Sequence, residues 1–464
     1  MINRDVNTSL NSSPKAGQSL ISLRPELITA IYNHPAQMAN LRTISSLLNF
    51  LRNCNGWTDL NDFQKLLFQH VYTAEERRSE CTRIVRRLQR GEKLPQNCPE
   101  PPLTGNPSEI DSWKIEVFIF ERIARQLRTV GDAMAWMCFK YDRKLIVALS
   151  YNQSAGPMFG KEGLGYELGR VEELQQEKRF GLLHDLTNCL RIADLTEFTP
   201  SGTPLLREIK KSRGVSGVQK TRIQDAINAV NTGTFFARNR PNSGPVMLQE
   251  KHKTNLKSLN DLIQLSKVRG TAGMQLPFGR ALIASSLPQY VAKWGESPEN
   301  FVSSMNTTRQ AAMKRAKITN DLHTMRATSG DLASRSVSLT PVSIYPFSSE
   351  DCASIICDHS IYETIISIDS LVRVFESVNL RAEILLPDEH GTVSENDNVL
   401  RISDGNRTMT VHGAGMNQLL FETFDPRSWA MGIKESFEMG DLPGEPTILF
   451  FRESRSWARN RLEI

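Results

Sequence analysis

Residues 180–224 read FGLLHDLTNCLRIADLTEFTPSGTPLLREIKKSRGVSGVQKTRIQ, and the centre of this stretch has the pattern of a β-hairpin. Residues 193–199 alternate apolar and polar side chains, as expected of a strand that is exposed on one face. The turn-forming residues of 200–204 follow, and residues 205–211 form the predicted return strand. The sequence therefore predicts two antiparallel strands joined by a short turn.

Strand periodicity brings three charged side chains of this hairpin together. Glu208 and Lys210 share one face of the return strand, because side chains two residues apart point the same way. A hairpin that is symmetric about Ser201 places Asp194 opposite Glu208. Symmetry about Gly202 places the same aspartate opposite Lys210 instead. Either register brings Asp194 within about 5 Å of one member of the pair, measured between Cβ atoms.

Two carboxylates at this separation repel each other unless a cation lies between them. Paired hard oxygen ligands suit Mg²⁺ or Mn²⁺. A neighbouring lysine can orient or help deprotonate a metal-bound water, or stabilise charge on a phosphate. The alternative interpretation is a surface hairpin with a cross-strand salt bridge.

The order and spacing of these residues resemble those of the PD-(D/E)xK nuclease superfamily, which has a restriction-endonuclease-like fold. Asp194 is followed, after thirteen intervening residues, by Glu208-Ile209-Lys210, the one Glu-x-Lys triplet among the 464 residues. Ala193 stands where the name of the family has proline. The resemblance covers about residues 160–240.

The resemblance implies a central mixed sheet flanked by helices and a catalytic site at the hairpin. Asp194, Glu208 and the Ile209 carbonyl would hold Mg²⁺ or Mn²⁺. Lys210 would position or activate the attacking water, and Gln224, from the helix that follows, would support the site. The implied reaction is hydrolysis of a phosphodiester bond.

Glu167 is a candidate for a further acid of this site. Many members of the superfamily carry such an acid near the start of a helix that precedes the metal-binding strands. Here Gly165-Tyr166-Glu167 lies at the start of a helix predicted for residues 163–178. The alternative is an exposed acid that the helix macrodipole favours near a helix N-terminus.

The densest basic run of the chain flanks the proposed site, at residues 207–222, where Glu208 is the single acid. A phosphodiester substrate needs such neutralisation of its charge. We therefore expect DNA, or less readily RNA, as the partner. The residues predicted to contact the nucleic acid are Lys211, Arg213, Lys220 and Arg222.

The composition is that of a soluble globular protein, with 39% hydrophobic and 23% charged residues and a net charge of +5. A mildly basic balance is compatible with a polyanionic partner. No apolar run has the length of a membrane span or a signal peptide. Seven cysteines without C-x-x-C spacing argue against a disulfide framework and a structural zinc site. We expect a cytoplasmic protein with no membrane association.

The chain as a whole is expected to be α/β, with the restriction-endonuclease-like core between a helical N-terminal region and a mixed α/β C-terminal module. A capping-box pattern at residues 73–76 predicts the start of a helix, and Asp404-Gly405 predicts a hairpin turn. The predicted segments are a helical region at 1–93, a Pro-rich linker at 94–107, the nuclease-like domain at 108–240, a helical region at 246–335 and the α/β module at 336–464.

The sequence thus favours a metal-dependent nuclease, with host defence as a role suggested by analogy alone. A homodimer is compatible with this reading, because cleavage of both DNA strands by this fold often needs two sites. One alternative is a non-catalytic nucleic-acid-binding or assembly protein that keeps the nuclease fold. Another is a metal-dependent hydrolase that acts on nucleotides, for which a closed pocket would replace a long basic groove.

Overall fold

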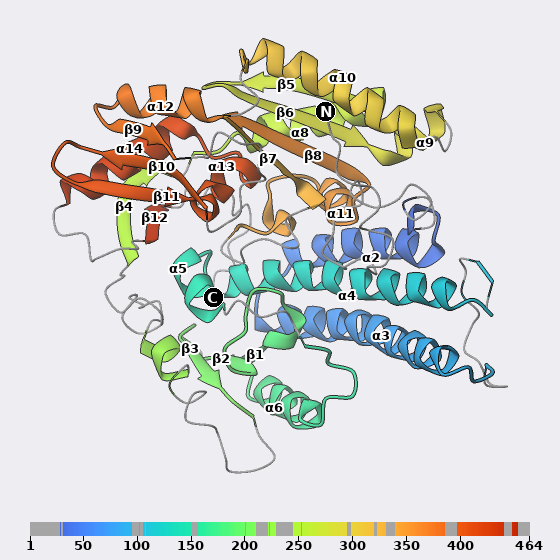
Figure 1. Cartoon of the computed structure of the whole chain (residues 1–464). Helices are drawn as coiled ribbons and strands as arrows, with labels where there is room; N and C mark the ends of the chain where they lie inside the picture. The colour runs from blue at the N-terminus through green and yellow to red at the C-terminus, as the bar shows by residue number, and fades with distance from the viewer. Residues whose placement is uncertain are drawn as a thin grey trace.

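The computed structural model arranges the described parts of the chain in three layers (Figure 1). Helices cross the middle, a small sheet with one helix lies below them, and a larger α/β region lies above them. The described residues are 28, 31–94, 102, 105–106, 108–150, 156–199, 201–209, 221, 223–228, 245–251, 253–294, 298–319, 323–330, 339–385, 397–439 and 448–452. Their side chains are described too, except those of 245–247, 249–251, 293–294, 298–299 and 448–452.

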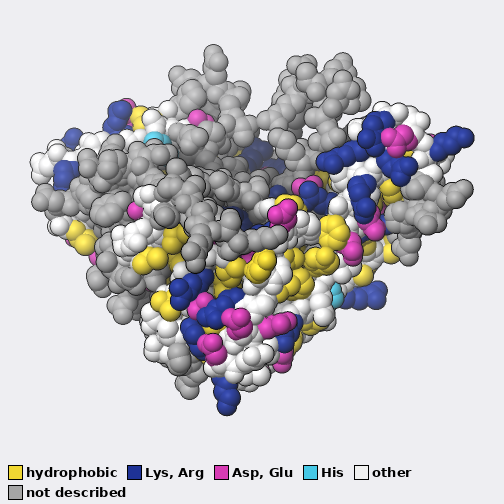
Figure 2. Space-filling view, turned by 90° about the horizontal axis from the view of Figure 1, so that it is seen from below, with side chains coloured by type: hydrophobic (Ala, Val, Ile, Leu, Met, Phe, Trp, Pro, Cys, Tyr) yellow, Lys and Arg dark blue, Asp and Glu magenta, His cyan; other side chains and the backbone are white. Residues whose placement is uncertain are grey.

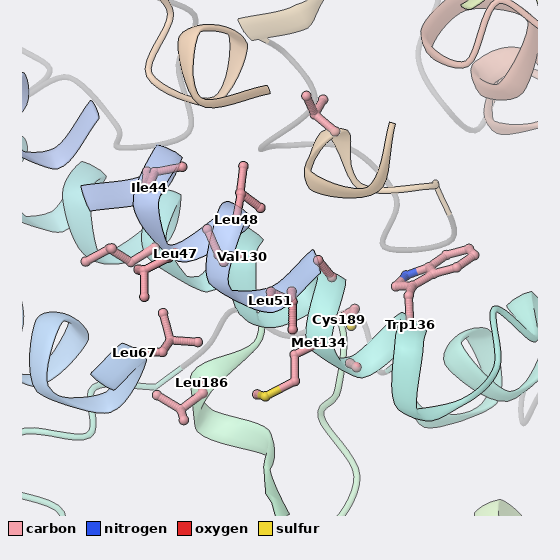
Figure 3. Packing of buried hydrophobic residues seen from close by; sticks show 14 of the residues in the cluster. Ile44, Leu47, Leu48, Leu51, Leu67, Val130, Met134, Trp136, Leu186 and Cys189 are labelled. Atoms are coloured by element: carbon pink, nitrogen blue, oxygen red, sulfur yellow. The ribbon is translucent and has the colours of Figure 1, made fainter. Parts of the chain in front are cut away.

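The middle layer consists of three helices that pack along one another. They are α2 (Pro35–Arg52), α3 (Trp57–Gln89) and α4 (Ile110–Cys138). Apolar residues at three- and four-residue spacing give each helix a buried face. Figure 3 shows Ile44, Leu47, Leu48 and Leu51 of α2 beside side chains of α3 and α4. The predicted helical N-terminal region is confirmed for α2 and α3.

One predicted helix boundary in this layer is wrong. No helix begins at residues 73–76, because α3 continues through them, and Glu75 is buried in an ion pair with Arg128. Helix α4 contains Gly131 in its interior. A Cβ at that position would lie 1.8 Å from the Leu186 carbonyl oxygen. The glycine therefore permits a close approach of two backbones instead of ending the helix.

The lower layer contains the predicted hairpin. Its elements are α5 (Arg143–Leu149), α6 (Leu164–Gln176), β1 (Phe180–Leu183), η2 (His184–Leu186), β2 (Leu195–Phe198) and β3 (Pro204–Arg207). The sheet has the order β1-β2-β3, and both strand pairs are antiparallel. The Gly181 backbone lies close to Leu174, so α6 packs against β1. The hairpin and the helix before it are confirmed.

The upper layer differs from the mainly helical expectation for residues 246–335. Its elements up to that boundary are β4 (Pro245–Lys251), α8 (Leu256–Arg269), β5 (Thr271–Leu276), β6 (Arg280–Ser286), α9 (Leu287–Trp294), α10 (Pro298–Arg315) and β7 (Thr324–Thr328). All residues of β6 are buried, and a short apolar run of this kind does not reveal by its periodicity whether it is helix or strand. These residues form a strand because they pair with a strand that is distant in the sequence.

That distant strand is β8 (Ser360–Ser367), which completes an antiparallel sheet of order β5-β6-β8-β7. The predicted boundary at residue 336 therefore passes through one sheet. Leu282 and Ala284 of β6 belong to the same core as α8, while Ala281 and Ile283 pack with α10. Helices thus cover both faces of this sheet.

The remainder of the upper layer confirms most of the predicted α/β pattern. Its elements are η4 (Val342–Ile344), α11 (Ser349–Ile356), α12 (Ile368–Glu376), β9 (Arg381–Ile384), β10 (Asn398–Ser403), β11 (Thr408–His412), η5 (Gly413–Met416), α13 (Asn417–Phe421), α14 (Pro426–Glu438) and β12 (Ile448–Arg452). The β10–β11 hairpin turns at Asp404-Gly405 as predicted. Strand β12 pairs in parallel with β4, which lies about 200 residues earlier in the chain.

One continuous hydrophobic core joins the lower, middle and upper layers, from Ile31 to Tyr362. Helices α3 and α4 share this core although the Pro-rich segment separates them in sequence. Arg143 of α5 reaches the upper layer, where its guanidinium binds both carboxylate oxygens of Glu422 at 2.8 and 3.0 Å. Within the described ranges, every helix is too short or too polar to span a lipid bilayer.

Candidate functional site: an acid cluster beside the β2–β3 hairpin

The hairpin register places Asp194 opposite Glu208. Leu195 pairs with Arg207, and the Asp194 N–H donates to the Arg207 carbonyl at 3.0 Å, which continues this register by one residue. The register is therefore the one that is symmetric about Ser201. Two backbone hydrogen bonds close the hairpin: the Thr199 N–H donates to the Thr203 carbonyl, and the Gly202 N–H donates to the Thr199 carbonyl. Gly202 adopts the positive φ of 77° that the turn requires.

The Asp194 carboxylate also contacts the residue that follows Glu208. The Ile209 N–H donates to Asp194 Oδ2 at 2.8 Å. Glu208 itself is half-buried. Two of the three predicted metal ligands thus lie on facing positions, and the backbone of the third is bonded to the first. The Ile209 carbonyl as a ligand stays a prediction.

Three carboxylates converge on the ammonium of Lys161, which sequence reasoning did not single out. Lys161 Nζ lies 2.7 Å from Glu167 Oε1, 2.7 Å from Asp185 Oδ2 and 3.4 Å from Asp194 Oδ1. We call Glu167, Asp185 and Asp194 the acid cluster. It joins the start of α6, the turn after β1 and the start of β2, so three segments of the lower layer meet at one nitrogen atom.

Glu167 is the most deeply buried member of the acid cluster, with 1% of its surface exposed. Its Oε1 binds Lys161, whereas its Oε2 is buried without a hydrogen-bond partner. Burial raises the pKa of Glu167, and the charges of Asp194 and Asp185 add to this, so the pKa stays above its ordinary value despite the contact with Lys161. The exposed-acid alternative for Glu167 is wrong.

Lys161 is held charged by its neighbours. Partial burial alone would lower the pKa of its ammonium, but the attraction of Asp185 and Glu167 outweighs this effect and raises the pKa above its ordinary value. The side chain of Lys161 is 30% exposed. One side of the acid cluster is therefore open to solvent.

A buried ion pair beneath the acid cluster positions the segment that carries Lys161. Arg128 of α4 binds Glu75 of α3 at 2.5 Å and also donates to the Gly156 and Asp185 carbonyls. Glu75 in turn accepts the N–H groups of Met158 and Phe159. The two central helices thus fix both the backbone before Lys161 and the backbone of Asp185.

His184 directly precedes Asp185 of the acid cluster, and its imidazole is hydrogen-bonded to a residue of the neighbouring strand β2. Its ring is buried and its Nε2 lies 2.7 Å from Thr196 Oγ1. Burial lowers the pKa of His184 to about 4, so the imidazole is neutral at physiological pH.

The remaining predicted residues are placed as follows. Gln224 lies in a helical stretch at 223–228, is exposed, and donates to Asn228 Oδ1 on the same stretch at 3.1 Å. This described contact does not link it to Asp194, so its supporting role stays a prediction. The residues that lie outside the described part of the chain are Lys210, Lys211, Arg213, Lys220 and Arg222.

A second charged cluster lies one helical turn further along α6. Glu197 of β2 is 1% exposed, and Arg170 binds its two oxygens at 2.9 and 3.1 Å. Arg179 and Arg207 lie 3.3 and 3.4 Å from the same carboxylate. We call these three arginines the arginine cluster. Burial alone would raise the pKa of Glu197, but the arginine cluster lowers it below its ordinary value.

The described surface below the sheet carries charge of both signs. Figure 2 shows Lys and Arg side chains interleaved with Asp and Glu side chains on this face. Among the described residues, no group of three or more His, Cys, Asp or Glu side chains is spaced to hold a metal ion as it stands. The six cysteines in the described ranges are free and buried.

No family model, curated protein or solved structure matches this chain.

Proposed function

We propose that this protein is a metal-dependent nuclease with a restriction-endonuclease-like core in its lower layer. One observation carries the proposal. Glu167 and Asp194, both predicted as acids of the site, contact the same group in the structure, the ammonium of Lys161. They lie 27 residues apart in sequence and on different elements. The resemblance suggested Glu167 and the hairpin pattern suggested Asp194, and both carboxylates lie within 3.4 Å of the Lys161 ammonium.

The donor atoms at this site have the chemistry that a divalent cation requires, although the described side chains are not spaced to coordinate one as they stand. Asp194 and Glu208 face each other across the hairpin, and Glu167 directs a buried carboxylate at the same place, with Oε2 lacking a partner. Carboxylate oxygens are the ligands that Mg²⁺ and Mn²⁺ prefer. Glu167, Asp194, Glu208 and the Ile209 carbonyl would hold the ion. When bound, it would supply charge stabilisation and a more acidic water.

The chain's own residues would orient the substrate around that ion. The hydrogen bond from the Ile209 N–H fixes Oδ2 of Asp194, and Oδ1 is directed at Lys161, where the other two acids of the cluster also lie. Lys210, which follows directly, would stabilise charge on the phosphate. The basic residues of 211–222 would neutralise the flanking phosphates of DNA.

A specific observation favours a second candidate, a non-catalytic nucleic-acid-binding or assembly protein on the same fold. Lys161 already neutralises part of the acid cluster, and no ready group of three metal-binding side chains occurs among the residues described. Such a protein would bind nucleic acid with strong salt dependence through its basic run and would not cleave it.

The test is cleavage of supercoiled, linear and single-stranded DNA, and of RNA, in Mg²⁺ or Mn²⁺. The informative variant is Asp194→Asn, because asparagine keeps an oxygen that can accept the Ile209 N–H while it removes the charge. We expect cleavage to fall more than about 100-fold. Lys210→Ala should lose activity as well.

The matched control is Asp111→Asn, the same change on an exposed residue of α4, which should cleave as the wild type does. Equal cleavage by Asp194→Asn and the wild type would remove the site from consideration. Salt-dependent binding without cleavage by any version would establish the non-catalytic candidate.

A further inference from the structure

The position of Lys161 has a consequence for how the site loads a metal, and this inference rests on the proposed function. A monovalent ammonium lies where the acid cluster converges, at 2.7 to 3.4 Å from one oxygen of each acid. Divalent metals lie about 2.0–2.6 Å from carboxylate oxygens. The acids are therefore held around a cation, but too far apart to coordinate a metal at the same point.

We propose that Lys161 is a built-in competitor of the metal: its ammonium occupies the site in the metal-free protein and swings out when a divalent cation enters. The three acids then close by roughly half an ångström or more onto the smaller ion. This accounts for the absence, in the described part of the chain, of a group already spaced for a metal.

The charge balance of the site favours the exchange. The acid cluster carries three carboxylates against the one ammonium, and its deepest oxygen, Glu167 Oε2, is buried without a partner. A divalent ion carries one charge more than Lys161 and accepts oxygen ligands from several directions. It can therefore satisfy an atom that the lysine leaves unbonded.

Lys161 can leave without moving the fold. The backbone around it is held, since its N–H donates to the Met158 carbonyl at 3.0 Å and Glu75 binds the neighbouring N–H groups. Its side chain is 30% exposed on a flexible four-carbon stem. Rotation of that side chain alone would carry the ammonium into solvent.

The first measurement is calorimetric titration of Mn²⁺ into the wild type, Lys161→Gln and Lys65→Gln. A competitor that fills the site more than 90% of the time weakens apparent affinity about tenfold or more. We therefore expect Lys161→Gln to bind Mn²⁺ at least about tenfold more tightly with unchanged stoichiometry. Lys65→Gln, the same change on the exposed face of α3, should match the wild type.

A second measurement needs no variant at the site and covers the case in which Lys161→Gln does not fold. Wild-type protein is labelled with acetic anhydride with and without Mn²⁺, and modification of Lys161 is compared with that of Lys65 by mass spectrometry. Displacement predicts that labelling of Lys161 rises in Mn²⁺ while that of Lys65 stays constant.

Three outcomes separate the two proposals. Tighter Mn²⁺ binding by Lys161→Gln, or labelling of Lys161 that rises with Mn²⁺, supports the exchange. If the wild type binds Mn²⁺ while affinity in Lys161→Gln is equal or weaker and labelling is constant, the exchange is wrong and the nuclease proposal stands. If neither protein binds Mn²⁺, both proposals are overturned.

Discussion

The two charged clusters along α6 have opposite electrostatic designs. At the acid cluster, three carboxylates share one lysine, the pKa of Glu167 is raised, and one of its buried oxygens has no partner. At the arginine cluster, three guanidiniums serve one carboxylate, the pKa of Glu197 is lowered, and both of its oxygens are bonded. Both glutamates are equally buried, so burial alone does not explain the contrast.

The contrast separates a structural ion pair from a site prepared for a ligand. Glu197 stabilises the folded state, because its charge is satisfied in full by residues of the chain. Glu167 retains an unsatisfied charge, which is unfavourable for folding and is typical of positions selected for function. The same substitution at the two positions should therefore have different consequences.

The largest expected effect is on cleavage. Glu167→Gln should lower metal-dependent cleavage by about 100-fold, because it removes one charge from the proposed metal site. Glu197→Gln should retain cleavage at a temperature where it remains folded. Glu172→Gln, on the exposed face of the same helix, is the control. Rates for DNA cleavage in Mn²⁺ measure all three, and equal rates for Glu167→Gln and Glu172→Gln would contradict the role of Glu167.

The next effect is on stability at the arginine cluster. Glu197→Gln should lower the free energy of unfolding by about 2 kcal/mol, because hydrogen bonds to a charged group are lost and three guanidiniums remain. Urea denaturation followed by circular dichroism measures it. A change smaller than a few tenths of a kcal/mol would show that the arginine cluster is a solvated surface feature.

The third effect concerns His184, which directly precedes Asp185 of the acid cluster. Its pKa of about 4 in the folded protein lies below the ordinary value of 6.5, so the unfolded chain binds more protons between these values. Stability should then fall as pH falls from 6.5 toward 4, by up to about 1.4 kcal/mol per pH unit. In His184→Gln this contribution should be absent. Parallel pH profiles of the wild type and the variant would argue against a buried neutral imidazole.

The smallest effect is the stability change at Glu167. Because its pKa is raised in the folded protein, its contribution to stability is present at low pH and is lost as pH rises through that pKa. Glutamine keeps the uncharged form and can still accept a bond from Lys161. Glu167→Gln should therefore melt at a slightly higher temperature than the wild type at pH 7.5, and the difference should shrink toward pH 5. A lower melting temperature at pH 7.5 would show that the ion pair with Lys161 outweighs the burial.

Local patterns predicted the parts of the site that are close in sequence. The alternation on both sides of residues 200–204 predicted the β2–β3 hairpin, and its two alternative registers included the observed one. Helical spacing predicted α6, which presents Glu167. Residues 73–76 were wrongly predicted as a helix start. The residue pattern of a capping box can also occur in the interior of a helix, as it does in α3.

Long-range contacts were beyond these patterns. Lys161 lies two residues before the predicted helix, and no spacing rule marks it as the partner of Asp185 and Asp194, 24 and 33 residues away. The buried run that forms β6 could also have been a helix until its pairing with β8, about 80 residues later, was known.

By itself, then, the sequence determined the helical character of α2 and α3 and the β2–β3 hairpin, because turn chemistry and side-chain periodicity act over a few residues. It left two registers open for that hairpin, and the structure has the one that places Asp194 opposite Glu208. The tertiary structure alone decided which charges meet at Lys161 and which meet at Glu197. These contacts between charged side chains depend on how α6 packs on strands β1 and β2. They also depend on how the Glu75–Arg128 ion pair holds the segment before Lys161. Packing of this kind is set by the whole core, so no local stretch of the chain encodes it.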